Sequence, residues 1–362
     1  MTSAAATRED WAALSLRQLP QSAWVALLRA LGGPRAILSA TRAQLAAVVP
    51  DDIIARLQAP VPGDTLARAQ AWLADPAHEI VAWDDPDYPK ALLELGFAPP
   101  MLYFVGRREL LNRPALAIVG SRNASAQGLE NARAFARALA DAGLTIVSGL
   151  ALGIDAAAHE GALAGAGATL AVVGTGLDRV YPARHRELAH AIAASGGLLS
   201  EFPPGTPPLE MNFPRRNRLI SGLSRGVLVV EAALQSGSLI TARYAGEQGR
   251  EVFAIPGSIH SPLARGCHKL IREGAKLVET AQDILEELGM AANGPPLQSK
   301  DAAPISDSPV LAALGDGPAG VDTLAARTGL PAGDVTVELT GLELAGIVAP
   351  LPGGKWQRQR QR

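Results

Sequence analysis

Four arginines gather between Glu210 and Glu231 with no acidic residue among them: Arg215, Arg216, Arg218 and Arg225. Guanidinium groups bind phosphates strongly, and Phe213, just before them, offers a ring on which a nucleobase can stack. Asn217 adds an amide to the same run. A run of charge is often only a solvated face, but this one leads into an apolar segment. We therefore expect it to lie beside the core and to bind a polyanion.

Three further segments combine glycine with hydroxyl-bearing side chains. Small residues let the backbone approach a phosphate closely, hydroxyls donate to its oxygens, and helix N-termini attract its charge. We expect all three segments to contact an anion. The candidate residues are Gly120, Ser121, Arg122 and Ser125 in the first segment, Ser148 and Gly149 in the second, and Ser236, Gly237, Ser238 and Thr241 in the third.

Signatures of nucleotide cofactors do not accompany these segments. Neither of the first two is spelled G-x-G-x-x-G, and Gly174-Thr175-Gly176 has a spacing that is common in plain α/β turns. No G-x-x-x-x-G-K-[ST] run occurs in the sequence. We therefore expect no cofactor.

Candidate catalytic groups are few. Residues 222–226 spell a nucleophile elbow, but they precede an apolar strand, whereas an elbow follows one. The six histidines lack a metal-binding spacing, and Asp155 fits the start of a helix better than the role of a general base. Glu231, at the end of a predicted strand, is the best remaining carboxylate. We expect no catalytic residue and no metal site, with a nucleotide-processing enzyme that uses Glu231 as the alternative.

The segments that must position these residues alternate between apolar, β-branched runs and helical patterns from residue 115 to about 286. This alternation is typical of a mostly parallel, doubly wound sheet covered by helices, in which ligands bind at the carboxyl ends of the strands. Strands are predicted over 115–119, 144–147, 169–173, 198–200, 227–231 and 251–255, and helices over 128–141 and 153–164.

The flanking segments predict two smaller domains. Residues 1–75 show leucines at helical spacing and paired short helices, which is typical of a SAM-like or helix-hairpin-helix module. A turn-rich, polar stretch at 83–89 indicates a junction, so we assign 76–291 to the Rossmann-like core. The proline-rich residues 292–309 predict a linker. Three short helices and a hairpin over 310–362 predict a winged helix, whose third helix, at 334–345, carries acids and no lysine or arginine.

Composition limits the setting in which these parts act. The 362 residues are 48% hydrophobic, with a formal net charge of −2, so nucleic-acid binding must come from local basic clusters. The single cysteine, Cys267, excludes an intramolecular disulfide and suits a reducing compartment. Residues 1–10 do not resemble a secretory signal, and the apolar window 163–177 is too short to span a membrane. We expect a cytoplasmic protein with no membrane segment.

Five motifs in order resemble the DNA-processing protein A family, also called DprA or Smf, across about residues 83–278. They are Val119-Gly120-Ser121-Arg122, Ser148-Gly149-Leu150-Ala151 with Gly153-Ile154-Asp155, residues 212–218, residues 236–242, and Ile255-Pro256-Gly257. The resemblance implies an extended Rossmann fold, a homodimer formed through that fold, and binding of single-stranded DNA. It further implies displacement of single-strand-binding protein and loading of RecA in natural transformation, with Arg122, Arg215, Arg216 and Arg218 as phosphate contacts and Phe213 as a stacking partner.

Two positions depart from the family pattern. Leu152 stands where arginine is frequent, which removes one DNA contact, and Cys267-His268 stands where asparagine is usual.

Two other functions remain open. A phosphoribohydrolase-like enzyme is disfavoured because its Pro-Gly-Gly-x-Gly-Thr loop is absent, and a duplex-DNA regulator acting through the winged helix is disfavoured by the acidic third helix. We expect single-strand binding without strong sequence preference.

Overall fold

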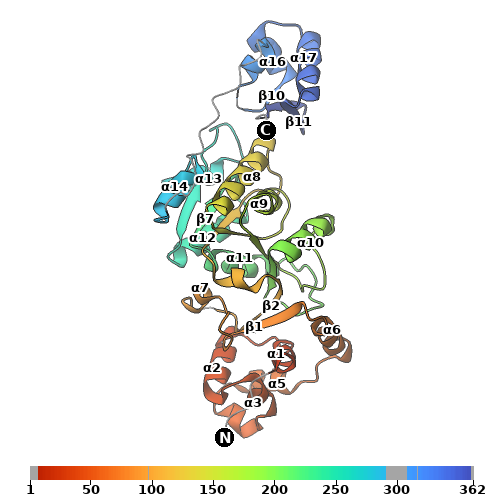
Figure 1. Ribbon diagram of the computed structural model, residues 1–362, viewed down its shortest axis with the longest axis vertical. Helices are drawn as coiled ribbons and strands as arrows, with labels where there is room; N and C mark the ends of the chain where they lie inside the picture. Colours follow the sequence, from red (N-terminus) through yellow and green to blue (C-terminus); the bar gives the residue numbers. More distant parts are fainter. Residues whose placement is uncertain (1–6, 97, 291–307, 316, 360–362) are drawn as a thin grey trace.

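The computed structural model describes residues 7–96, 98–290, 308–315 and 317–359 (Figure 1). Its largest element is a sheet of nine strands in the order β1-β2-β6-β5-β4-β3-β7-β8-β9. The strands from β6 to β9 in that order are parallel, whereas β1 and β2 pair antiparallel at one edge. The strand bounds are β1 His78–Ala82, β2 Met101–Gly106, β3 Ala115–Val119, β4 Thr145–Ser148, β5 Thr169–Val172, β6 Gly197–Ser200, β7 Gly226–Val229, β8 Glu251–Ala254 and β9 Lys276–Leu277.

The sheet is doubly wound around β3. From β3 the chain proceeds outward through β4, β5 and β6, then returns to place β7 on the other side of β3 before continuing to β8 and β9. The predicted fold class is confirmed, and all six predicted strands are present with ends shifted by two residues at most. The antiparallel strands β1 and β2 were not anticipated.

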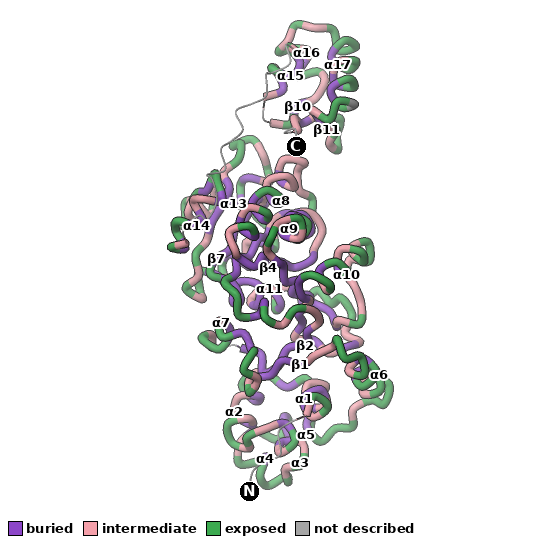
Figure 2. Tube along the Cα trace, in the orientation of Figure 1, coloured by how far each residue is buried: buried purple, intermediate pink, exposed green. Residues whose placement is uncertain are grey.

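Both faces of the sheet are buried, because alternate side chains of each strand pack against opposite helix layers. Leu116 and Ile118 of β3 pack toward one layer, and Ala117 and Val119 pack toward the other. Figure 2 shows buried strands between helices whose outer faces are exposed. The first layer contains α8 Ala126–Asp141, α9 Ile154–Leu163, α10 Arg186–Ser195 and α14 Ala281–Glu287. The second contains α7 Lys90–Leu93, α11 Asn212–Gly222, α12 Ser238–Glu247 and α13 Arg265–Arg272.

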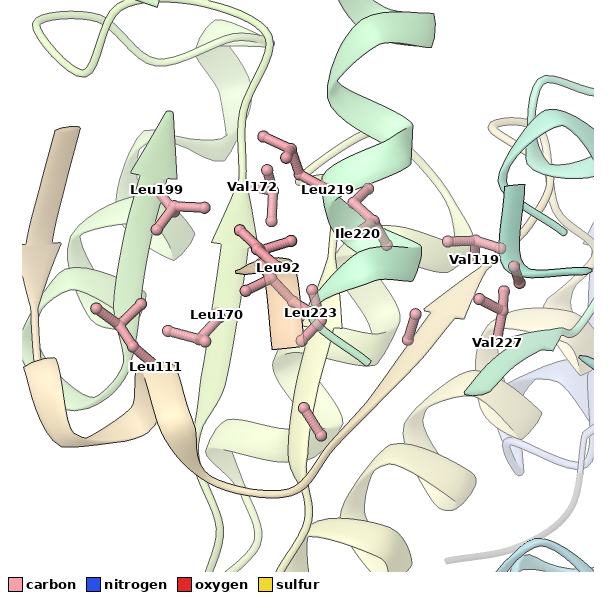
Figure 3. Close-up of a cluster of buried hydrophobic side chains, with 14 of the residues drawn as sticks. Leu92, Leu111, Val119, Leu170, Val172, Leu199, Leu219, Ile220, Leu223 and Val227 are labelled. Atoms are coloured by element: carbon pink, nitrogen blue, oxygen red, sulfur yellow. The ribbon is translucent and has the colours of Figure 1, made fainter. Parts of the chain in front are cut away.

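Helix α11 is anchored on the sheet by one apolar face. Leu219, Ile220 and Leu223 are buried against residues of β3, β5, β6 and β7, including Val172 and Val227 (Figure 3). Burial of each such side chain stabilises the fold by about 1.5–3 kcal/mol. The anchoring places the preceding turns of α11, which carry the arginines, over the carboxyl end of β5.

The N-terminal helices share a core with the antiparallel edge of the sheet. Trp11, Trp24 and Trp72 are buried together with Ile80 of β1 and Tyr103 of β2. The N-terminal helices are α1 Arg8–Ser15, α2 Gln21–Leu31, α3 Pro34–Ser39, α4 Arg42–Ala46, α5 Asp51–Gln58 and α6 Gly63–Leu73. Two short 3-10 helices lie later in the chain, η1 Arg108–Asn112 after β2 and η2 Ala183–His185 before α10.

The C-terminal elements occur in the order of a winged helix-turn-helix and bury their own apolar cluster around Leu324 and Leu339. The predicted hairpin is present as β11 Val348–Leu351 and β12 Lys355–Arg358. The remaining elements are α15 Pro309–Leu314, β10 Ala319–Gly320, α16 Val321–Thr328 and α17 Ala332–Leu344. Residues 292–307 of the predicted linker, 292–309, lie outside the described residues. Among the helices described, none has the length and apolarity needed to cross a membrane.

Candidate functional site

A pocket of about 420 Å³, the switch-point pocket, opens at the carboxyl ends of β3 and β7. The winding direction reverses between these two strands, and in open α/β sheets ligands bind in the crevice at this reversal. Ten of the fifteen candidate residues line it: Gly120, Ser121, Arg122, Phe213, Arg216, Asn217, Ser236, Gly237, Ser238 and Thr241. The structure therefore brings together one arginine of the run, its neighbours Phe213 and Asn217, and two of the three glycine-hydroxyl segments.

The first wall of the pocket is the loop after β3. Gly120 is required because a Cβ there would lie 2.6 Å from the Ile154 side chain. The Ser121 amide donates to the Glu231 carbonyl at 2.7 Å, and its carbonyl accepts from the Ile154 amide at 3.1 Å. Arg122 is exposed, with its guanidinium carbon 5.7 Å from the centre of the Phe213 ring. The loop thus holds a cation against an aromatic ring at the mouth of the pocket.

The second wall is α11, whose helical period separates the arginines that the sequence groups together. Phe213, Arg216, Asn217 and Ile220 share the face that lines the pocket. Arg215 lies on another face, over the ring of Phe202 and 3.8 Å from Glu201, which also pairs with Arg218. The arginine run is therefore not a single cationic surface, and of Arg215, Arg216 and Arg218 only Arg216 lines the pocket.

Arg216 is a buried cation, only 4% exposed. Its Nη1 donates to the Val172 carbonyl, and within the described chain its Nε has no hydrogen-bond partner. Burial lowers the pKa of Arg216 to about 10, while the nearby Asp155 carboxylate opposes this shift. A guanidinium this deeply buried interacts strongly with any ligand charge that enters the pocket.

Asp155 lines the same pocket and is 7% exposed. It lies in the first turn of α9, as predicted. Its Oδ2 accepts from the amides of Gly149 and Ala151 at 3.1 and 3.4 Å. Burial raises the pKa of Asp155, against the opposing effects of Arg216, the two amides and Arg122. The pocket therefore holds an acidic group beside its buried cation.

The third wall is the start of α12. The Ser236 and Ser238 hydroxyls hydrogen-bond to each other at 2.7 Å, and the Ser238 amide donates to the Ser236 hydroxyl. Gly237 is exposed, whereas Thr241, one turn into the helix, is buried against the pocket. The N-terminus of this ten-residue helix and its hydroxyls favour an anion at this wall.

Ala151 of the loop after β4 lines the pocket, but the two predicted residues there, Ser148 and Gly149, lie behind it. Ser148 is buried and donates to the Ile118 carbonyl at 2.6 Å. Gly149 packs on Arg216, because a Cβ there would lie 2.0 Å from Nη1. Gly149 therefore positions Arg216, whereas Ser148 joins β4 to the neighbouring β3.

Leu150 in this loop adopts a positive φ of 57°, which two histidines hold in place. Its amide donates to His159 Nε2 at 3.3 Å, and its carbonyl accepts from His185 Nδ1 at 3.0 Å. The Thr169 hydroxyl donates to Ile146 and so accepts from His159 Nδ1, which leaves Nε2 as an acceptor. Burial lowers the pKa of His159 to about 3, and this neutral histidine is a structural residue.

Ser125 and the Glu231 carboxylate are joined by two hydrogen bonds. The Ser125 amide and hydroxyl donate to Glu231 Oε2 and Oε1 at 2.9 and 2.5 Å, and the same hydroxyl accepts from the Gly128 amide as the N-cap of α8. Burial raises the pKa of Glu231, although the two bonds from Ser125 oppose this. Both carboxylate oxygens are engaged, which disfavours the enzyme alternative that used Glu231 as a free base.

Sequence reasoning missed Tyr181 at the rim of the pocket. Its side chain is 48% exposed, and its ring centre lies 5.7 Å from that of Phe213 at an interplanar angle of 35°. Together Arg122, Phe213 and Tyr181 form a row of planar groups, which we call the stacking row. Tyr181 follows the third parallel strand by several residues, and only the fold brings it to α11.

The fold and the pocket define a Rossmann-type α/β protein whose pocket, at the reversal of its sheet, is lined by groups that favour an anion. Arginine, hydroxyl groups and a helix N-terminus supply the donors. The chain belongs to the family described as DNA recombination-mediator protein A, whose model matches residues 79–289. A second model, the DprA winged helix domain, matches residues 294–354. The family resemblance and the winged-helix prediction are thereby confirmed.

Similar proteins agree with this assignment. Protein Smf of Escherichia coli K12 is 47% identical over 294 residues, which make up 78% of each chain. DNA processing protein DprA of Streptococcus pneumoniae is 51% identical over 203 residues, or 56% of this chain and 72% of the relative. The X-ray structure of DprA from Streptococcus pneumoniae matches with a TM-score of 0.69 and 39% identity, covering 78% of this chain and 99% of that one.

A second solved structure concerns ligand binding. It describes the single-stranded DNA binding mode of DNA processing protein A from Helicobacter pylori, and it matches with a TM-score of 0.53 and 32% identity. The match covers 58% of this chain and 95% of that one.

Proposed function

We propose that this chain binds single-stranded DNA at the switch-point pocket and acts as a recombination mediator that protects incoming DNA and loads RecA in natural transformation. The observation that carries the proposal is the combination, in one pocket, of buried Arg216, the N-terminus of α12 and the stacking row at the rim. The Helicobacter pylori relative, for which single-stranded DNA binding is described, supports it.

The pocket walls suggest how a strand is held. Phosphates bind Arg122 and the hydroxyls of Ser236 and Ser238, while a base stacks on Phe213 or Tyr181. Arg215, with a side chain 61% exposed, contacts the strand further along. The remaining candidates act by positioning: Ser125 through Glu231, Ser148 through its bond to Ile118 of β3, Gly149 through Arg216, and Arg218 through Glu201.

The chain is proposed to work without covalent chemistry, cofactor or metal, as a cytoplasmic homodimer joined through the core, and to displace single-strand-binding protein before RecA is loaded. Its proposed domains are residues 1–75, 76–291 and 310–362, with the linker at 292–309. The acidic α17 disfavours the alternative of duplex-DNA regulation, because Asp334 and Glu343 are exposed on it.

Fluorescence anisotropy with labelled single-stranded and duplex oligonucleotides tests the proposal. If about four phosphates are neutralised per protomer, the log-log dependence of affinity on salt has a slope of roughly −3. Arg122→Ala is expected to weaken single-strand binding. Arg137→Ala is the matched control, since Arg137 is an exposed arginine near the far end of α8. A salt slope near zero, or equal affinities in the two variants, would contradict the proposal.

A further inference from the structure

Tyr181 of the stacking row lies in a segment that contains neither helix nor strand. Residues 173–182 connect β5 to η2 in irregular conformation. The Tyr181 side chain is 48% exposed, and its ring centre lies 5.7 Å from that of Phe213. Packing alone holds so exposed a ring weakly, because few atoms surround it. Its position beside Phe213 therefore depends on the hydrogen bonds that hold the neighbouring backbone.

Side-chain hydrogen bonds hold the chain on both sides of Tyr181. On the N-terminal side, Asp178 Oδ1 accepts from the Gly205 amide at 2.7 Å. On the C-terminal side, His185 Nδ1 hydrogen-bonds to the Leu150 carbonyl at 3.0 Å. The His185 amide also donates at 3.0 Å to the carbonyl of the residue that follows Tyr181, which closes a turn. Because a carbonyl oxygen only accepts, Nδ1 carries the proton in the bond to Leu150.

The Leu150 peptide is a rigid point of attachment for that bond. Leu150 is buried and has a φ of 57°, a conformation that leucine rarely adopts. Its amide donates to His159 of α9 at 3.3 Å. The amides on either side of it, those of Gly149 and Ala151, donate to Asp155 of the same helix. Three amide bonds to one helix therefore fix the direction of the Leu150 carbonyl.

We propose that His185 is a positioning residue for strand binding, because its bond to the Leu150 carbonyl holds Tyr181 in the stacking row. The inference rests on the proposed single-strand binding. His185 does not line the switch-point pocket, so its effect on a strand passes through Tyr181. Without the Nδ1 donor, the turn after Tyr181 loses its link to the loop after β4, and the ring can move away from Phe213. A displaced ring no longer offers its face to a base.

Fluorine NMR on protein labelled with 3-fluorotyrosine tests the positioning without DNA. The chain has four tyrosines, and Tyr181→Phe assigns the signal of Tyr181. His185→Leu removes the donor and should shift or broaden that signal. His185→Asn should restore it, because the asparagine side-chain amide lies close to the place of Nδ1 and donates the same bond. An unchanged Tyr181 signal in His185→Leu would overturn the inference.

The same spectra contain the controls. The signals of Tyr88 and Tyr103, which are both buried, should stay unchanged and show that the fold is intact. If His185→Leu does not fold, His185→Gln takes its place, because the glutamine amide reaches the position of Nε2 and cannot replace the Nδ1 bond. His190→Leu removes an exposed histidine from α10 and should leave the Tyr181 signal unchanged.

Anisotropy with a labelled single strand measures the consequence for binding. His185→Leu should bind about tenfold more weakly than the wild type, as expected for the loss of one stacking ring, and His185→Asn should bind within about twofold of it. In a Tyr181→Ala background, His185→Leu should change the affinity by less than about twofold, because no ring is left to position. An equal loss in both backgrounds would refute the inference. If the wild type binds no strand, the proposed function fails, and the fluorine signals still decide whether His185 positions Tyr181.

Discussion

Arg122 and Arg216 line the same pocket, but replacing Arg216 should destabilise the protein, whereas replacing Arg122 should hardly change its stability. Arg122 is exposed and its guanidinium stands over the Phe213 ring, so Arg122→Met should change the free energy of unfolding by less than about 0.5 kcal/mol. Arg216 is buried, bonds the Val172 carbonyl and offsets the charge of buried Asp155. Arg216→Met leaves that acid without its cation.

The expected loss follows from the groups that Arg216 leaves behind. Its removal leaves the Val172 carbonyl without its donor and the buried Asp155 without a cation that offsets its charge, which should cost about 2–3 kcal/mol and, for a unit of this size, lower Tm by about 4–12 °C. Adding Asp155→Asn to Arg216→Met removes the uncompensated charge and should restore part of the loss. Calorimetry on the wild type, Arg216→Met, Asp155→Asn and the double variant gives the coupling free energy between Arg216 and Asp155. Anisotropy well below Tm gives the DNA affinity, which Arg122→Met and Arg216→Met should each lower.

The result that refutes this reasoning is specific. If Arg216→Met melts within 2 °C of the wild type, the guanidinium is not the buried counter-charge of Asp155. If Arg122→Met melts as low as Arg216→Met, the loop after β3 is structural and the proposed division of roles is wrong.

Three further outcomes are expected. His159 has a pKa of about 3 in the folded protein and about 6.5 in the unfolded protein, so the unfolded state binds more protons between these two pH values. The free energy of unfolding should therefore fall by up to roughly 5 kcal/mol as the pH drops from about 6.5 to 3. Melting curves across this pH range should show less of this loss in His159→Gln, whereas exposed His190→Gln should behave as wild type. Tyr181→Ala should cost about 1–3 kcal/mol of single-strand affinity by anisotropy, with Tyr181→Phe near wild type, and equal affinities would remove Tyr181 from the site. Deleting residues 293–362 should keep single-strand affinity within about tenfold, and a larger loss in a gel shift would give the winged helix a direct role in binding the strand.

The strands that position the pocket were predictable from sequence, and most of the pocket residues with them. The central parallel strands β3, β4, β5 and β7 are buried on both faces and read as short apolar runs, as in residues 115–119. Because parallel strands end at one edge, the glycine-hydroxyl segments after β3 and β7 had to converge. The antiparallel strands β1 and β2 were not predicted, and β1, His78–Ala82, is too short to separate from the helices before it.

The roles of individual residues were less predictable, because they depend on helical phase and distant partners. The sequence groups Arg215, Arg216 and Arg218, but a period of 3.6 residues turns Arg216 into the pocket and the other two toward Glu201. Tyr181 reaches Phe213 only through the fold. No local signal marks either outcome.

The partner of Ser125 explains why this Rossmann-type fold carries no dinucleotide signature. In dinucleotide-binding relatives of the fold, a phosphate sits at the N-terminus of the helix after the first parallel strand. Here the Glu231 carboxylate occupies that position at the start of α8, and Gly128 leaves room for it, since a Cβ there would lie 2.4 Å from the carboxyl group. Glu231 and a phosphate would compete for the same amides, and the internal carboxylate is already tethered. Under the proposed function, a strand would therefore contact the N-terminus of α12 and Arg122, on the two sides of the pocket that also contains Asp155 and Arg216.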